Sequence, residues 1–447
     1  MLFAKMKAKS RTMADGNSQS PRLAEAFRAL RYYNFRLFFA GQLISLVGTW
    51  MQMVAQSWLV YRLTGSSALL GLISFSSQIP VFLFSPLGGV VADRYNRHRL
   101  LVLTQSSSMV LALILAALTL THHILIWHIF VLSALLGVVN AFDIPVRQSF
   151  FQEMVGRADL INAIALNSSM YNSARIVGPA IAGLLVSWIG EGWCFFANGV
   201  SYIAVIAGLL LMHVTPRVVA RTEESAWQHV REGARFVATA RPMRALLLLI
   251  GMVGFFGLQY STLMPIFADR IFHSGAHGLG VLLGINGAGA LWGALVMAAK
   301  RGLQGLTRWI AVAACVFSVS LMAFAVAPTF WSAAALLFVV GFATMIQFGS
   351  TNTLIQMMSP DRLRGRAISA YSMMNMGMTP IGSMAAGFIA EHTGARVTVA
   401  AGGAICLIGS LIYASRLSDI RAEVREMLQL ASGTPPEQIA AQGGVRS

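Results

Sequence analysis

Residues 89–99 read Gly89-Val-Val-Ala-Asp93-Arg94-Tyr95-Asn96-Arg97-His98-Arg99, a charged segment with one acid and three arginines. On each side stands an apolar run, near residues 68–92 and 100–120. Each run is long enough to cross a bilayer as a helix, which takes about 20 residues. Because charged side chains are costly in hydrocarbon, the segment belongs at a membrane interface. The stretch therefore indicates a helical membrane protein in which a charged loop joins two spanning helices.

The whole chain has the composition of a polytopic membrane protein. Of its 447 residues, 56% are hydrophobic and 11% are charged, whereas about a quarter of a soluble domain is charged. We predict an all-α polytopic membrane protein with twelve transmembrane helices in two six-helix pseudo-symmetric halves. The predicted helix cores are 37–61, 68–92, 100–120, 124–145, 161–188, 193–213, 244–268, 278–299, 309–327, 331–354, 367–390 and 397–415.

The net charge of +16 is distributed along the chain in a way that predicts topology. If the N-terminus is cytoplasmic, every lysine and arginine falls in a cytoplasmic segment except four. Arg62, Arg270 and Arg396 lie outside, and Arg175 lies within a helix. This positive-inside pattern predicts a multi-pass protein with both termini in the cytoplasm. It also accounts for the basicity without a nucleic-acid partner.

The longest polar break, near residues 213–244, separates six predicted helices from the other six. Within it, apolar residues gather on one helical face and arginines on the other, which predicts an amphipathic helix at the membrane surface. A solvated linker is the alternative. The predicted segments are a disordered cytoplasmic tail at 1–35, the first half at 36–213, the linker at 214–243, the second half at 244–416 and a cytoplasmic tail at 417–447.

The two halves are related in sequence. An offset of 204 residues aligns Gly178 with Gly382 and Gly183 with Gly387, which makes the fifth and eleventh helices counterparts. Parallel halves of this kind rock about a central site and expose it to each side of the membrane in turn. The repeat therefore predicts alternating access.

The charged loop can act as a gate at the cytoplasmic face. The eleventh helix begins near Arg366 on that face, and its free N–H groups carry partial positive charge that Asp93 can neutralise. The alternative is that the charges are solvated and only hold the loop on the cytoplasmic side. That role needs only basic residues, and the negative charge of Asp93 would oppose it. We predict that the gate motif consists of Gly89, Asp93, Arg94, Arg97 and Arg99.

The fifth predicted helix carries the second motif. Pro179 lacks the N–H that would bond one turn back, so it bends the helix. Gly178, Ala182 and Gly183 form a small face that lets another helix approach closely. Ordinary small-residue packing is an equal alternative to a functional motif. Arg175, buried in the same helix, needs a partner or a wet cavity.

Asp143 is the acid nearest in sequence that could pair with Arg175, although Arg147 competes for it as an i, i+4 neighbour. We favour a structural ion pair, and a proton site is the alternative. If the protein couples to protons, Asp143 is the first candidate, with Asp269 and Glu391 as more peripheral ones.

Polar side chains form stripes on the first, fourth and tenth predicted helices, and in lipid such stripes must face protein or water. For any one residue, hydrogen bonding between helices is the alternative, but the five polar residues of the first helix favour a cavity. Methionine-rich surroundings suit a large amphipathic organic substrate. The predicted cavity residues are Gln42, Thr49, Gln52, Gln56, Asn140, Gln259, Tyr260, Thr344, Gln347 and Thr351.

The pattern Gly89-x-x-x-Asp93-Arg94-x-x-Arg97-x-Arg99 resembles the loop signature of the major facilitator superfamily. Asn96 stands where the usual form carries Gly, and Asn tolerates the positive φ that such a Gly often serves. The stretches 34–42, 143–148 and 162–168 look like the branch of enterobactin exporters and macrolide-efflux proteins, and the Arg175–Gly183 segment resembles the antiporter motif. The resemblance covers all twelve helices. It implies a bacterial inner-membrane exporter, commonly driven by proton antiport, and hence a siderophore- or macrolide-like substrate.

Other classes of protein are excluded or less favoured. An ATP-driven pump would need a Gly-Lys-Ser/Thr phosphate loop, and no Gly-Lys pair occurs in the chain. The acids, histidines and cysteines form no catalytic or metal pattern, so we expect no enzyme activity, no metal and no cofactor. We expect a monomer that binds a small molecule, membrane lipid and protons. A substrate importer or facilitator on the same fold is the closest alternative.

Overall fold

The computed structural model describes residues 27–213, 240–299, 305–359 and 361–431. The predicted amphipathic helix of the linker and the outer parts of both tails lie outside these described residues. The short 3₁₀ helix η1 (Arg28–Arg31) precedes the first long helix. Within the described residues, η1 and the start of the next helix lie inside the segment 1–35 that we expected to be a disordered tail.

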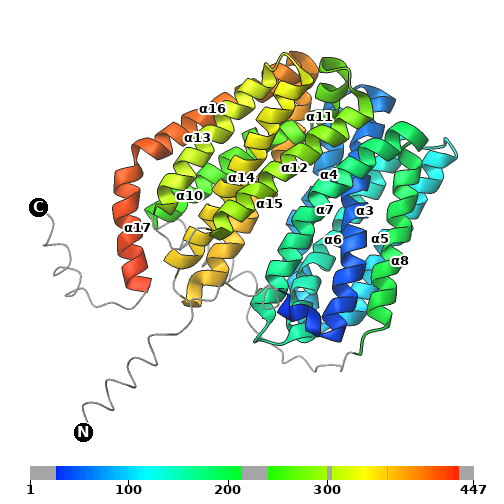
Figure 1. Cartoon of the computed structure of the whole chain (residues 1–447), viewed down its shortest axis with the longest axis horizontal. Helices are drawn as coiled ribbons and strands as arrows, with labels where there is room; N and C mark the ends of the chain where they lie inside the picture. Colours follow the sequence, from blue (N-terminus) through cyan, green and yellow to red (C-terminus); the bar gives the residue numbers. More distant parts are fainter. Residues whose placement is uncertain (1–26, 214–239, 300–304, 360, 432–447) are drawn as a thin grey trace, which may run out of the picture.

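Six long helices form the first half of the molecule (Figure 1). They are α3 (Tyr33–Thr64), α4 (Ser67–Arg94), α5 (Arg97–Leu120), α6 (Ile126–Val155), α7 (Leu160–Ile189) and α8 (Glu191–Leu210).

The second half begins with a broken helix. α10 (Arg241–Met252) continues through the π-helical η2 (Val253–Gly257), the 3₁₀ turn η3 (Leu258–Ser261), α11 (Met264–Ile266) and the π-helical η4 (Phe267–Ile271). The remaining helices are α12 (Gly275–Ala299), α13 (Leu306–Ala325), α14 (Phe330–Met358), α15 (Asp361–Thr393), α16 (Ala395–Ser415) and the terminal α17 (Leu417–Ala431).

Eleven helices within the described residues are long and apolar enough to cross a membrane, with 241–271 counted as one. The twelfth, α15, is 33 residues long but carries Ser, Asn, Thr and Met through its length. It packs against α4, the broken helix and α16 within the bundle. The predicted all-α polytopic fold with twelve transmembrane helices in two six-helix halves is confirmed.

Two pairs of glycines show the pseudo-symmetry of the halves. Gly183 of α7 lies against Gly280 of α12, and Gly387 of α15 lies against Gly71 of α4. A Cβ added to Gly280 would lie 2.5 Å from the carbonyl oxygen of Pro179, so the two backbones meet where no side chain fits. The 204-residue offset that aligns Gly183 with Gly387 thus relates two equivalent helix contacts between the halves.

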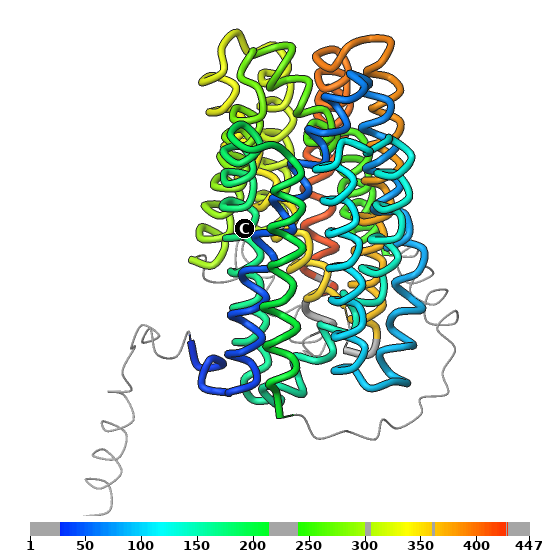
Figure 2. The backbone as a smooth tube through the Cα atoms, turned by 90° about the vertical axis from the view of Figure 1, so that its right-hand side faces the viewer, coloured from blue at the N-terminus to red at the C-terminus, as the bar shows by residue number. Residues whose placement is uncertain are grey.

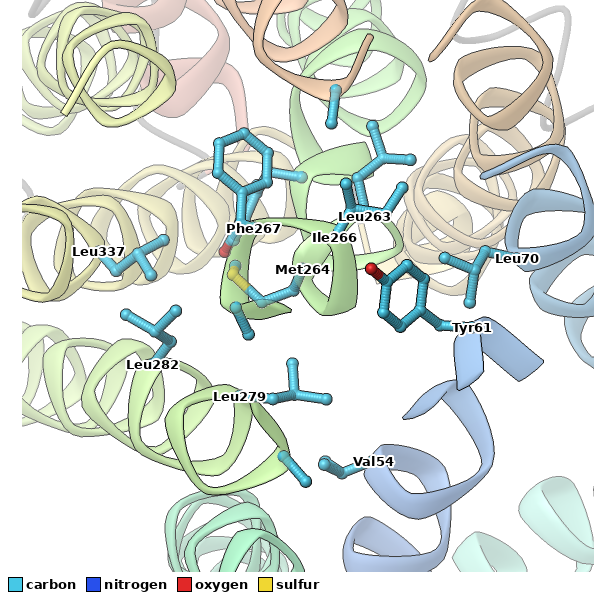
Figure 3. Close-up of a cluster of buried hydrophobic side chains, with 14 of the residues drawn as sticks. Val54, Tyr61, Leu70, Leu263, Met264, Ile266, Phe267, Leu279, Leu282 and Leu337 are labelled. Atoms are coloured by element: carbon cyan, nitrogen blue, oxygen red, sulfur yellow. The ribbon is translucent and has the colours of Figure 1, made fainter. Parts of the chain in front are cut away.

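Hydrophobic packing joins the halves at one end of the bundle. We call the end at which α3 begins and α16 finishes the tail end, and the opposite end the far end (Figures 1 and 2). The largest buried cluster, at the far end, contains residues of both halves, and Tyr61 and Leu70 lie there beside Leu263 (Figure 3). The tail-end clusters around Phe150 and Leu246 each belong to one half. The core therefore joins the halves at the far end and leaves them separate at the tail end.

Candidate functional site

Polar contacts between the halves close the far end at the tips of α3 and η4. The Tyr61 hydroxyl donates to Asp269 Oδ2 at 2.8 Å, and Arg270 Nη2 donates to the Gly65 carbonyl oxygen at 3.0 Å. The Arg270 guanidinium carbon also lies 5.7 Å from the centroid of the Tyr61 ring. These three contacts tie the end of the first helix in one half to the end of the first helix in the other.

Glu391 of α15 makes the second polar contact across the far end. Its Oε2 accepts hydrogen bonds from the backbone N–H groups of Ser67 at 2.7 Å and Ala68 at 3.1 Å. It also accepts from the hydroxyls of Ser66 at 3.1 Å and Ser67 at 2.7 Å. All four donors stand at the N-terminus of α4, where free N–H groups and the helix dipole favour an anion. Glu391 therefore caps a helix of the opposite half.

One stripe of α7 marks where the halves separate. Ala182, Arg175 and Tyr171 are seven and four residues apart, so they lie on one side of the helix. From the far end to the tail end, the exposed fraction rises from 0% at Ala182 to 48% at Tyr171, with Arg175 intermediate. Gly178 lies on the same side of α7 and packs on α3, and Gly183 packs on α12 of the other half. The stripe therefore runs where α7 borders α3 and the second half, and its side chains are exposed on the tail side of Arg175.

Arg175 lies at the point where this stripe changes from buried to accessible. Its Nη2 donates to Asn286 Oδ1 of α12 at 3.4 Å, which is beyond the usual hydrogen-bond range. None of the ion pairs among the described residues includes Arg175. The predicted pair with Asp143 is therefore wrong, and a neutral amide of the other half is the partner of the guanidinium.

Asp143 is bound inside the first half instead. Its Oδ2 accepts from Arg147, the i, i+4 competitor, and its Oδ1 accepts from Thr104 and Gln105 of α5, each at 2.8 Å. The side chain is 2% exposed. The pitch of α6 places residue 143 on the face that packs against α5, away from α7. Asp143 therefore forms its ion pair with Arg147, the competitor, and not with Arg175 as we favoured.

Several predicted cavity residues bond within their own half. Gln52 of α3 accepts from Asn198 of α8 at 2.7 Å, and Gln56 donates to Ser133 of α6 at 2.8 Å. For Gln52 and Gln56 the structure therefore shows hydrogen bonding between helices, which was the alternative to a cavity wall. Of the other predicted residues in the first half and on α14, the structure buries Gln42, Gln347 and Thr351 and leaves Thr49, Asn140 and Thr344 half-buried.

Gln259 satisfies backbone groups where the first helix of the second half is broken. Its Nε2 donates to the Gly254 carbonyl oxygen at 2.5 Å, and its Oε1 accepts from the Ser383 hydroxyl of α15 at 2.6 Å. Irregular helical turns free carbonyl groups that need such partners in a membrane. Gln259 and its buried neighbour Tyr260 thus lie in the packing of the second half.

The gate motif lies at the accessible tail end. α4 ends at Arg94, and Asp93 accepts from Arg97 at 3.3 Å with 63% of its side chain exposed. Arg97 is 16% exposed and also donates to Glu153 of α6 at 2.6 Å, a contact that sequence analysis did not predict. A Cβ added to Gly89 would meet nothing within 4 Å. The predicted contact of Asp93 with the N-terminus of α15 stays a prediction. It applies to a conformation in which the tail end is closed.

Asn96 is the N-cap of α5. Its side-chain oxygen accepts from the Arg99 N–H at 3.0 Å, and its φ is −64°. The positive φ that we associated with this position is not adopted, because an N-cap residue takes an extended backbone.

Sequence analysis also did not predict a buried anchor at the tail end. Asp159, before α7, accepts hydrogen bonds from Tyr32 and Arg31, each at 2.7 Å, and pairs with Arg28. The Tyr32 hydrogen bond and the two guanidinium groups hold the pKa of Asp159 below its usual range. The partners are about 130 positions apart in sequence, and a basic run before the first helix signals only topology.

The sequence profile of a family described as transmembrane secretion effectors matches residues 24–441. The chain is 24% identical to a staphyloferrin A transporter of Staphylococcus aureus, over 87% of this chain and 98% of that protein. It is 25% identical to an enterobactin exporter of Shigella boydii, over 91% of this chain and 95% of that protein. It is also 25% identical to a multidrug efflux pump of Mycolicibacterium fortuitum, over 78% of this chain and 88% of that protein.

Solved transporter structures share the fold. A bacterial homologue of the human lysosomal transporter Spinster, in an inward-facing and unoccupied conformation, superposes with a TM-score of 0.67 at 15% identity. That match covers 88% of this chain and 98% of the other. A peptide transporter of the POT type, in complex with sulfate, gives a TM-score of 0.71 at 13% identity over 88% of this chain and 96% of the other.

Proposed function

The chain belongs to the transmembrane secretion effector family, within the branch of the major facilitator superfamily that contains enterobactin exporters and efflux pumps, and it is a transporter of that type. From this premise we propose that it exports a bulky amphipathic organic compound by alternating access. The proposed substrate is siderophore-like or macrolide-like, in keeping with the relatives that are named for siderophores and drugs.

The observation that carries alternating access is that the contacts between the halves occupy the part of the bundle that includes the far end, as deep as Gly287 beside Arg175 and Gly377 beside Phe82. There the Tyr61–Asp269 bond, the Glu391 cap and the close glycine pairs join the halves. At the tail end each half has its own hydrophobic cluster. Contacts of this kind can break at one end while the opposite end closes, which is what rocking of two halves requires.

We place the tail end in the cytoplasm of a bacterial cell, in the inner membrane. The positive-inside distribution of Lys and Arg supports this orientation. In the present conformation the substrate would then enter from the cytoplasm, along the accessible side of α7, and leave after the far end opens.

We propose proton antiport as the driving reaction. Asp143 remains the first candidate in the bundle, although three donors already occupy its carboxylate. Asp269 is a stronger candidate than its peripheral position suggested, because it accepts one hydrogen bond across the far-end interface. Glu391 is a weaker one, because four donors at the start of α4 favour its charged form. Protonation of an acceptor carboxylate removes the charge that such a bond uses.

Everted membrane vesicles test direction, coupling and substrate class together. Vesicles that contain the protein, supplied with radiolabelled enterobactin or erythromycin, are expected to accumulate label when the lumen is made acidic. The accumulation should disappear with an uncoupler and in vesicles from cells without the protein. Accumulation only in right-side-out vesicles would indicate an importer, and absence of gradient-dependent uptake of either compound would contradict the proposed export.

A further inference from the structure

The exposed stripe of α7 places one cation, Arg175, between the halves without an acidic partner among the described residues. A guanidinium inside a membrane protein needs a counter-charge or water, because hydrocarbon solvates charge poorly. Its contact with Asn286 is 3.4 Å long and supplies only an amide oxygen. The guanidinium of Arg175 therefore has N–H donors without a hydrogen-bond partner among the described residues, on the exposed part of the α7 stripe.

The neighbouring cation does not compete with Arg175 for an anion. Arg147 is 19% exposed and is neutralised by Asp143, which lies on its own helix. The pair Asp143–Arg147 is neutral as a unit, and this leaves Arg175 as the uncompensated charge on this wall.

Aromatic surface adjoins the cation. The ring of Tyr171 meets that of Trp50 of α3 edge-on, with centroids 5.5 Å apart. A planar guanidinium binds a carboxylate through two parallel hydrogen bonds, and aromatic faces accept the apolar body of an amphipathic molecule.

We infer that Arg175 binds a carboxylate-type oxyanion of the transported compound, whose apolar part lies on Trp50 and Tyr171. This inference rests on the proposed transport function, and it adds that the substrate is an amphipathic anion. Arg175, Trp50 and Tyr171 come from two helices of the first half, and Asn286 from the second, so the site lies where the halves meet.

A matched pair of fluorescent probes tests the inference on the purified full-length protein in detergent. Dansyl-phenylalanine carries a carboxylate, and its carboxamide has the same shape without the charge. We expect the carboxylate to bind at least about tenfold more tightly to the wild-type protein, since charge-assisted hydrogen bonds exceed neutral ones by this order. Equal affinities, or no binding of either probe, would overturn the inference.

Variants assign the preference to one residue. Arg175→Gln should reduce the affinity for the carboxylate to that for the carboxamide and leave the carboxamide unchanged, and Arg175→Lys should retain part of the preference. Arg157→Gln, an exposed arginine in the turn between α6 and α7, is the matched control and should bind as the wild type does. A preference that persists in Arg175→Gln would contradict the assignment.

A labelling measurement covers the case in which Arg175→Gln does not fold. Ser168 is exposed one further turn toward the tail end, so Ser168→Cys should react with N-ethylmaleimide and be protected by the carboxylate probe but not by the carboxamide. Equal protection by both probes would contradict the inference. Because neither measurement needs a proton gradient or transport, its failure is distinguishable from failure of the vesicle experiment.

Discussion

Glu391 is the residue on which the far-end contact depends most. One carboxylate oxygen accepts four hydrogen bonds at the start of α4, and an amide at that position would lose the charge that favours them. Glu391→Gln should weaken the interface by about 1 kcal/mol and raise the far-end-open population about fivefold. Pulsed EPR distances between spin labels at Leu63 and Val397, one in each half, measure that population.

Glu191→Gln is the matched control for Glu391→Gln. Glu191 pairs with Arg62 at 2.7 Å within the first half, so its loss should leave the distribution of label distances unchanged. If both variants shift the distances equally, the effect is not specific to the interface between the halves and the Glu391 cap is not a gate.

Asp159 gives a pH dependence whose sign follows from its environment. The pKa of Asp159 is lowered in the folded protein. Its contribution to the free energy of unfolding is therefore complete above its pKa in the unfolded chain, about 3.9, and is lost as the pH falls through its pKa in the folded protein. The difference in Tm between wild type and Asp159→Asn should be constant above about pH 5 and shrink below about pH 4. Thermal unfolding followed by tryptophan fluorescence measures it.

Tyr32→Phe removes one donor to Asp159 and leaves both arginine partners in place. Its Tm should lie between those of the wild type and Asp159→Asn at neutral pH. A Tm difference between wild type and Asp159→Asn that grows as the pH falls would contradict the assigned direction of the pKa shift.

At the scale of helices, two glycines should shift the conformational equilibrium in opposite directions. A Cβ on Gly71 would overlap the Ser383 carbonyl oxygen, whereas a Cβ on Gly89 meets nothing within 4 Å in this conformation. Gly71→Val should open the far end, because overpacking costs about 1–3 kcal/mol. Gly89→Val should have the reverse effect, because it hinders closure of the tail end upon α15.

The same spin-label pair at Leu63 and Val397 reports both glycine variants. The far-end-open fraction should rise above the wild-type value for Gly71→Val and fall below it for Gly89→Val. Shifts of the same sign in both variants would contradict the assignment of Gly89 to a gate at the opposite end.

Periodic and compositional features of the helices were predictable from the sequence. Long apolar runs defined the spans, and the 204-residue offset identified α7 and α15 as counterparts because small residues recur wherever helices must touch. Contacts between distant segments were not predictable. Asp143 faces α5 because of the rotation of α6, and Glu391 reaches α4 through the assembly of the halves, neither of which is encoded by local spacing.

The break in the first helix of the second half also escaped prediction. The run 244–268 is uniformly apolar, and its hydropathy is the same whether the backbone is α-helical or π-helical. The residues that could have indicated the break are Gly251, Gly254, Gly257 and Pro265. Glycines weaken a helix, and proline removes a backbone hydrogen-bond donor. Gln259 was interpreted as a residue of the cavity wall, although its amide bonds the backbone where the helix is broken.

At the scale of the whole molecule, two six-helix units meet at one end and diverge toward the other (Figure 1). Pseudo-symmetry makes this arrangement reversible, because equivalent glycine contacts, Gly71 with Gly387 and Gly183 with Gly280, border both sides of the interface. Alternating access therefore requires that the far end open in each transport cycle.

A reversible cross-link at the far end tests that requirement directly. Tyr61→Cys and Asp269→Cys, combined in a chain whose Cys194, Cys315 and Cys406 are replaced, place two thiols on the helix ends that the 2.8 Å hydrogen bond joins. A bis-methanethiosulfonate reagent can span thiols that are too far apart for a direct disulfide. Cross-linking with this reagent before the vesicles are everted should abolish gradient-driven accumulation of the labelled compound, and a reductant should restore it. Undiminished accumulation with the cross-link fully formed would contradict alternating access through this interface.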